Sequence, residues 1–215
     1  IEPKVEYQVT IPQVEPVSRG LITFAFISTW IAIALGIISS LLFLIPMAGE
    51  LSRGGLRDEL SGVAAGGIIL GVLAMSVFMA AMLFTAIVYM VVLYRGWKCL
   101  QSLRLISPGS ALDMPTPGTA LGLLFIPMYN FYWIFPCYMG FEKYGVELAR
   151  ARGLTYKGPT SGFAKGFGIL CLLSVTLLLP LFPLLIVALT IMSYMLALRI
   201  NDMITVLGRP FMIDR

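Results

Sequence analysis

The sequence predicts an all-α integral membrane protein with four full transmembrane helices and one re-entrant or broken helix. Three observations carry this prediction. Hydrophobic residues make up 59% of the 215 residues and charged residues only 12%, whereas a soluble domain has about 45–50% and about 25%. Several uncharged apolar runs exceed the length of about 18 residues that indicates a membrane-spanning helix. A further apolar stretch, residues 118–141, is interrupted in its middle by prolines.

Residues 1–19 form a polar N-terminal arm before the first apolar run. Within it, Val5, Tyr7, Val9 and Ile11 alternate with polar residues, a period of two that is typical of a short strand. Two interpretations remain open: a frayed linker, or a strand that pairs with the edge of a neighbour.

Residues 21–45 are the first predicted span, with Ser18 as its N-cap and Pro46 where the helix should stop. Residues 62–94 are the second. A helix of that length is roughly 50 Å long, so it must tilt or protrude from a hydrocarbon core of about 30 Å. Its start carries four closely spaced glycines that let another helix approach: Gly62, Gly66, Gly67 and Gly71. They pack either within the monomer or at a subunit interface.

The polar segments after these spans carry basic residues that belong at the level of lipid headgroups. An amphipathic helix is expected in the segment from Glu142 to Phe163 and should end near Gly153. Either plain positive-inside topology or binding of anionic headgroups explains the basic residues. The candidate headgroup contacts are Arg95, Lys98, Arg150, Arg152 and Lys157.

The stretch 118–141 predicts a half-helix over Thr119–Ile126, a turn at Pro127–Asn130 and a returning helix from Phe131. Asn130 can cap the returning helix or tie the turn to its own backbone. The aromatic side chains here form either an interfacial belt or the lining of a pore or ligand site. The candidate pore or packing site comprises Pro127, Tyr129, Asn130, Tyr132 and Trp133.

The last apolar block is interpreted as two spans, residues 162–180 and 183–203, with a single kinked helix as the alternative. Near its end, the spacing of Arg199 and Asp202 favours a local ion pair. Residues 20–207 therefore make one transmembrane domain, followed by a tail at 208–215.

The distribution of lysine and arginine discriminates between topologies. If 118–141 re-enters on the same side and the last block is a hairpin, 13 of the 15 basic residues lie on one side. A full crossing of 118–141 gives a weaker asymmetry. Both termini are therefore expected in the cytoplasm.

A resemblance supports this layout. Tyr94-Arg95 is followed by Pro117-Gly118-Thr119-Ala120, an apolar run, and Ile126-Pro127-Met128-Tyr129-Asn130. This order resembles a group of small uncharacterised bacterial membrane proteins that share a domain of unknown function. The resemblance covers about fifty residues. It implies an inner-membrane protein with two spans before the motif and a hydrophobic hairpin after it, and it implies no activity. Some such proteins carry an extra N-terminal soluble module.

The composition argues against catalysis. The chain has no His, its three Cys are far apart, and the acidic residue within a predicted span, Asp202, lies at the very end of the last one. Neither a metal site nor a cofactor is expected. The net charge of +4 reports membrane orientation and not nucleic-acid binding. The chain is therefore predicted to be a non-enzymatic scaffold or accessory subunit, contacting lipids and either its own copies or other membrane subunits. The alternative is an oligomeric channel or small-solute pore built around Pro127–Asn130.

Overall fold

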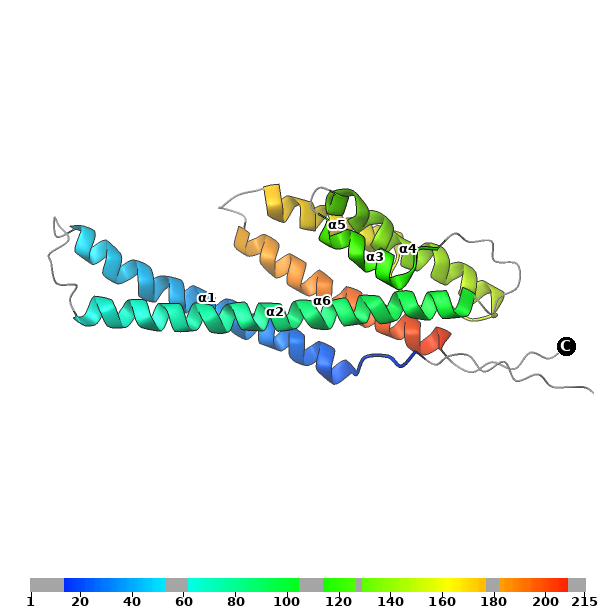
Figure 1. The fold of residues 1–215 in the computed structure, drawn as a ribbon, viewed down its shortest axis with the longest axis horizontal. Helices are drawn as coiled ribbons and strands as arrows, with labels where there is room; N and C mark the ends of the chain where they lie inside the picture. Colours follow the sequence, from blue (N-terminus) through cyan, green and yellow to red (C-terminus); the bar gives the residue numbers. More distant parts are fainter. Residues whose placement is uncertain (1–13, 53–61, 105–113, 127–128, 177–181, 209–215) are drawn as a thin grey trace, which may run out of the picture. The chain divides into compact units, whose positions relative to one another are not determined.

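The computed structural model describes residues 14–52, 62–104, 114–126, 129–176 and 182–208, and every regular element among them is helical (Figure 1). In chain order these elements are α1 (Arg19–Ser52), α2 (Gly62–Arg104), α3 (Pro117–Gly122), the 3-10 turn η1 (Leu123–Phe125), α4 (Tyr129–Ala151), α5 (Ser161–Thr176) and α6 (Phe182–Leu207). The predicted strand at Val5–Ile11 lies outside the described residues.

Three helical segments are long and apolar enough to cross a membrane: Arg19–Leu42, Gly66–Arg104 and Leu184–Leu207. The apolar part of α5, Ser161–Leu173, is shorter. Among the described residues the prediction of an all-helical fold is confirmed, and the length and composition of these three helices indicate a membrane protein. The fourth full span remains a prediction.

The first helix starts as predicted and ends later. The Ser18 hydroxyl accepts a hydrogen bond from the backbone N–H of Leu21 at 3.2 Å, which caps α1. The predicted stop at Pro46 is wrong, because α1 continues to Ser52. A proline removes one backbone donor, and transmembrane helices tolerate this where the remaining ladder and neighbouring groups satisfy the freed carbonyl.

The chain divides into two compact units, of which one is Thr23–Val88. This unit is an antiparallel pair of α1 and α2 that meet along a narrow seam with alternating three- and four-residue spacing. The α1 seam residues are Ala25, Thr29, Ala32, Gly36 and Ser39. Those of α2 are Gly71, Ala74, Phe78, Ala81 and Thr85.

Hydroxyl groups tie this seam together. The side chains of Thr29 and Thr85 share a hydrogen bond of 2.9 Å, and Thr85 also donates to the Ala25 carbonyl at 3.2 Å. Ser39 donates to the Gly71 carbonyl at 2.7 Å. A Cβ built on Gly36 would lie 3.3 Å from the Phe78 ring. Small residues therefore bring the two backbones close enough for one helix to satisfy hydroxyl donors of the other.

The second unit comprises Ile1–Ile22 and Tyr89–Arg215. Its described part has an aromatic core centred on Trp97, which is 1% exposed. The Trp97 ring lies 5.1 Å from the Phe141 ring and 5.9 Å from the Tyr144 ring, centroid to centroid. Two glycines make this packing possible. A Cβ on Gly140 would lie 2.6 Å from the Trp97 ring, and one on Gly96 would lie 2.7 Å from both Phe141 and Ile200. The core thus joins α2, α4 and α6.

Helices α5 and α6 form an antiparallel hairpin in this unit (Figure 1). Arg199 lies 5.4 Å over the Phe163 ring, and further along the pair a Cβ on Gly166 would lie 3.5 Å from Met192. These contacts between the start of α5 and the later part of α6 exclude a single kinked helix over the block. The antiparallel pair of the predicted hairpin is therefore found, whereas the crossing of the membrane by α5 stays a prediction.

The polar ends of these helices gather in one place. Arg19 of α1 forms an ion pair with Asp202 of α6 at 2.5 Å, so the predicted local pair of Arg199 and Asp202 is wrong. Arg95 donates to the Glu15 carbonyl at 3.0 Å. Arg152 donates to the Leu207 carbonyl at the end of α6, where a cation also complements the helix dipole.

Replacing Gly140 with alanine should destabilise the second unit. The added Cβ would overlap the Trp97 ring, whose position is fixed by α2 and α4 together. We expect a loss of about 1–3 kcal/mol, the range for an overpacked core. Thermal unfolding in lipid nanodiscs measures this loss.

The matched control is Gly66→Ala in α2, where a Cβ would meet nothing within 4 Å. This variant should be neutral or more stable by about 0.5–1 kcal/mol, because glycine is unfavourable within a helix. Equal unfolding midpoints for both variants would contradict the packing described for Trp97.

Candidate functional site

The broken stretch folds back on itself. Thr116 caps α3, its hydroxyl accepting the Thr119 N–H at 3.2 Å, and Pro117 opens the helix. After η1, the Asn130 N–H donates to the Ile126 carbonyl at 2.9 Å. The Trp133 indole N–H then donates to the Ala120 carbonyl at 2.8 Å, which joins the two limbs. The chain therefore reverses direction between η1 and α4.

The predicted details of this reversal are partly right. The first limb ends close to Ile126 as predicted, but the returning helix begins at Tyr129 and not at Phe131. Asn130 is consequently the second residue of α4, so the expectation that it caps this helix is wrong. Pro127 lies outside the described residues.

The predicted aromatic residues form a cluster at the start of α4. The Tyr129 ring is stacked at 5.9 Å on the Trp133 ring and meets the Tyr132 ring edge-on at 5.8 Å. Tyr129 and Tyr132 are exposed, whereas Asn130 and Trp133 are half-buried. The rings of three predicted site residues, Tyr129, Tyr132 and Trp133, thus lie together at the start of α4.

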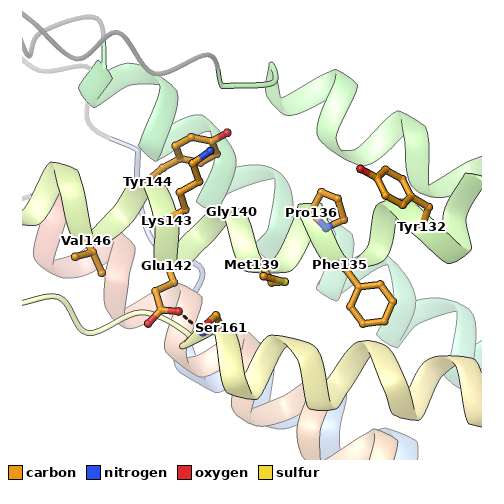
Figure 2. Close-up of a pocket in the computed structure, with 10 residues that line it drawn as sticks. All are labelled: Tyr132, Phe135, Pro136, Met139, Gly140, Glu142, Lys143, Tyr144, Val146 and Ser161. Atoms are coloured by element: carbon orange, nitrogen blue, oxygen red, sulfur yellow. Dashed lines mark hydrogen bonds between the residues drawn. The ribbon is translucent and has the colours of Figure 1, made fainter.

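A groove of about 710 Å³ runs along α4 beside this cluster (Figure 2). One end is apolar and is lined by Tyr132, Phe135, Pro136 and Met139. Pro136 lies inside α4 and has no N–H, so the Tyr132 carbonyl lacks its usual partner in the helix. Asn130 is not among the residues that line this groove.

The other end of the groove is charged. There the Glu142 carboxylate accepts a hydrogen bond from the backbone N–H of Ser161, the first residue of α5 (Figure 2). A carboxylate at this position offsets the positive end of the helix dipole. Lys143 is exposed, and its Nζ lies 5.2 Å from the centroid of the Tyr144 ring.

Tyr156 supports the charged end from the loop between α4 and α5. Its hydroxyl donates to the Pro159 carbonyl at 2.9 Å, and a Cβ on Gly145 would lie 2.5 Å from its ring. Burial, with a smaller contribution from the negative charge of Glu142, raises the pKa of the Tyr156 hydroxyl. The hydroxyl therefore remains a neutral donor that fixes the loop.

The sequence interpretation concentrated on the turn and missed the groove. The signal was present as residues 132, 136, 139 and 143, which recur at helical spacing and change from aromatic and apolar to charged. Treating 118–141 and the segment after Glu142 as separate elements concealed this stripe, because α4 contains both.

The four glycines of the predicted helix–helix interface lie in different surroundings. Gly71 is buried in the seam between α1 and α2, and Gly67 is half-buried. Gly66 is exposed and has open space where a Cβ would be, and Gly62 is the first residue of α2. At least part of the glycine-rich start therefore packs within the monomer.

The five residues predicted to contact lipid headgroups fall into two groups, those with hydrogen-bond partners in the protein and those that are exposed. Arg95 and Arg152 donate to backbone carbonyls, as described above. Burial lowers the pKa of the Arg152 guanidinium, although Cys99 acts in the opposite direction. Lys98, Arg150 and Lys157 are exposed. The two arginines with carbonyl partners thus have structural roles within the second unit.

Within the described ranges, no group of three or more His, Cys, Asp or Glu residues could hold a metal ion. Comparison with protein families, characterised proteins and solved structures finds no match to this chain.

The groove is lined mainly by apolar side chains and has one exposed ammonium group, that of Lys143, at its charged end.

Substituting Glu142 with glutamine should loosen the start of α5. The amide oxygen can still accept the Ser161 N–H, but the charge at the helix N-terminus is lost. We expect a cost of about 0.3–1 kcal/mol. Hydrogen exchange of the first turn of α5 should become faster.

Glu147→Gln is the control, because Glu147 is an exposed carboxylate on the same helix and does not line the groove. It should leave exchange in α5 unchanged. Equal acceleration in both variants would show that total charge, and not the Glu142 contact, stabilises this turn.

Proposed function

We propose that this chain is a non-enzymatic multi-pass membrane protein that acts as a scaffold or accessory subunit of a membrane complex or homo-oligomer. One observation carries the proposal. The α1–α2 pair uses a single narrow seam for its own packing and leaves the rest of a long apolar surface available.

The exposed side chains on this pair are large and apolar. Ile31 is 57% exposed on α1, and Leu73 and Leu83 are 59% and 64% exposed on α2. Lipid can cover such a surface, since lipid tails are as apolar as these side chains. Gly66 and Ala80 are also exposed on α2 and leave room for the close approach of another helix.

The topology belongs to the same proposal. Four helices cross the bacterial inner membrane, residues 118–141 re-enter, and both termini lie in the cytoplasm. Two features support this. The ends of α1, α2, α4 and α6 that carry Arg19, Arg95, Arg152 and Arg199 lie together in the second unit. The chain folds back on itself within residues 118–141, where the Trp133 indole N–H donates to the Ala120 carbonyl and joins the two limbs.

Cysteine labelling from one side of the membrane tests this topology. Single cysteines at Ser110 and Thr160 should react with the same membrane-impermeant reagent from the cytoplasmic side only, because re-entry returns the chain to its starting side. Labelling of the two positions from opposite sides would contradict the re-entrant arrangement.

Photocrosslinking tests the accessory role. A photoreactive amino acid at Ile31 or Leu83 should give a protein adduct of defined mass in native membranes, because these side chains point away from the seam. The same amino acid at Lys157, in the polar loop before α5, is the control and should give no such adduct.

Adducts with lipid alone, from a chain that purifies as a monomer, would contradict the accessory role. The competing proposal is an oligomeric channel or small-solute pore at Pro127–Asn130. Solute flux through reconstituted liposomes that Asn130→Leu abolishes, with assembly intact, would favour that pore. The resemblance to small bacterial membrane proteins remains a prediction compatible with either role.

A further inference from the structure

The groove along α4 runs in the direction of α6, which contains a segment long and apolar enough to cross a membrane. A Cβ built on Gly168 of α5 would lie 2.7 Å from the Phe135 ring of α4, so the ring packs against the backbone there. Further along the pair, the Glu142 carboxylate of α4 accepts a hydrogen bond from the N–H of Ser161. Helices α4 and α5 are therefore antiparallel, and α5 is in turn antiparallel to α6. Since α6 contains a segment able to cross the bilayer, the groove is aligned with that crossing.

The length of the groove corresponds to one leaflet. From Tyr132 at the apolar end to Lys143 at the charged end, a helix rises about 16 Å. Half of a hydrocarbon core of about 30 Å is about 15 Å. The volume of about 710 Å³ lies within the range of about 300–1,000 Å³ typical of ligand sites.

The charged end favours an anion. Glu142 is already bound to the N-terminus of α5, which offsets its charge. Lys143 is exposed at the same end and supplies an ammonium group. By contrast, Arg95 and Arg152 donate to backbone carbonyls. Lys143 is thus the cation placed where the apolar groove meets the headgroup level.

We propose that this groove binds one anionic phospholipid of the adjacent leaflet, with an acyl chain along Tyr132–Met139 and the phosphate on Lys143. An acyl chain gains little hydrophobic free energy by moving from the bilayer into an equally apolar groove. Preference over bulk lipid therefore comes from the headgroup charge and from the fit of the chain. The proposal requires membrane insertion alone and holds for either function considered above.

Native mass spectrometry of the full chain tests the headgroup contact. Lys143→Gln should weaken retention of phosphatidylglycerol about five-fold, the factor for about 1 kcal/mol per basic residue near anionic lipid. Retention of phosphatidylcholine should not change. Lys98→Gln is the matched control, since Lys98 is an exposed lysine on α2 that does not line the groove. Equal loss in the two variants would overturn the proposal.

A second measurement needs no change at Lys143. Phosphatidylglycerol with a photoreactive acyl chain should label residues 132–139 of the wild-type chain, and Met139→Trp should abolish this labelling by filling the groove. Labelling spread evenly over the exposed faces of α1 and α2 would identify annular lipid only and overturn the proposal. A protein adduct from a photoreactive residue at Met139 would overturn it as well.

Discussion

The second unit depends on the contact between the Trp97 ring and the backbone of Gly140. With α4 this close, Phe141 and Tyr144 can pack on the indole, and Gly96 on α2 allows Phe141 and Ile200 to meet on the other side. Since Phe141 is followed directly by Glu142 and Lys143, the same contact fixes the charged end of the groove. A glycine-permitted approach in the core therefore sets the position of surface groups on α4.

Around this core, charged side chains act mainly on helix ends. Glu142 binds the N-terminus of α5, and Arg152 binds the C-terminus of α6. Helix termini leave unsatisfied backbone groups, and these become costly close to an apolar medium. Long basic and acidic side chains from neighbouring elements satisfy some of them here. Charge in this protein thus contributes to its architecture.

Much of this fold follows from the sequence, because the length of an apolar run and the local turn residues indicate where helices lie. The break before Asn130, the hairpin of α5 and α6, and the end of α4 near Gly153 were all predictable. Gly153 has a φ of 64°, a conformation that glycine adopts without strain and that is common just beyond a helix C-terminus. These are local features, and each depends on a few adjacent residues.

Features that depend on distant residues were not predictable. The partner of Asp202 is Arg19, far away in the chain, and nothing in the spacing of Arg199 indicates this. The continuation of α1 past Pro46 and of α4 through Pro136 shows that one missing donor does not end a helix. The groove was predictable in part, since its stripe lies on α4 alone, but its wall also includes Ser161, which only the packing of α5 on α4 brings there.

The seam of α1 and α2 has an evolutionary consequence. Only its small residues, such as Ala25, Thr29 and Gly36, are under steric constraint, since enlarging them would separate the two backbones. For the fold of the pair alone, the outward positions need only remain apolar. Such a pair can exchange most of its side chains by neutral drift and keep its structure. The pattern of small residues, and not overall identity, is therefore the character by which distant descendants of this hairpin can be recognised.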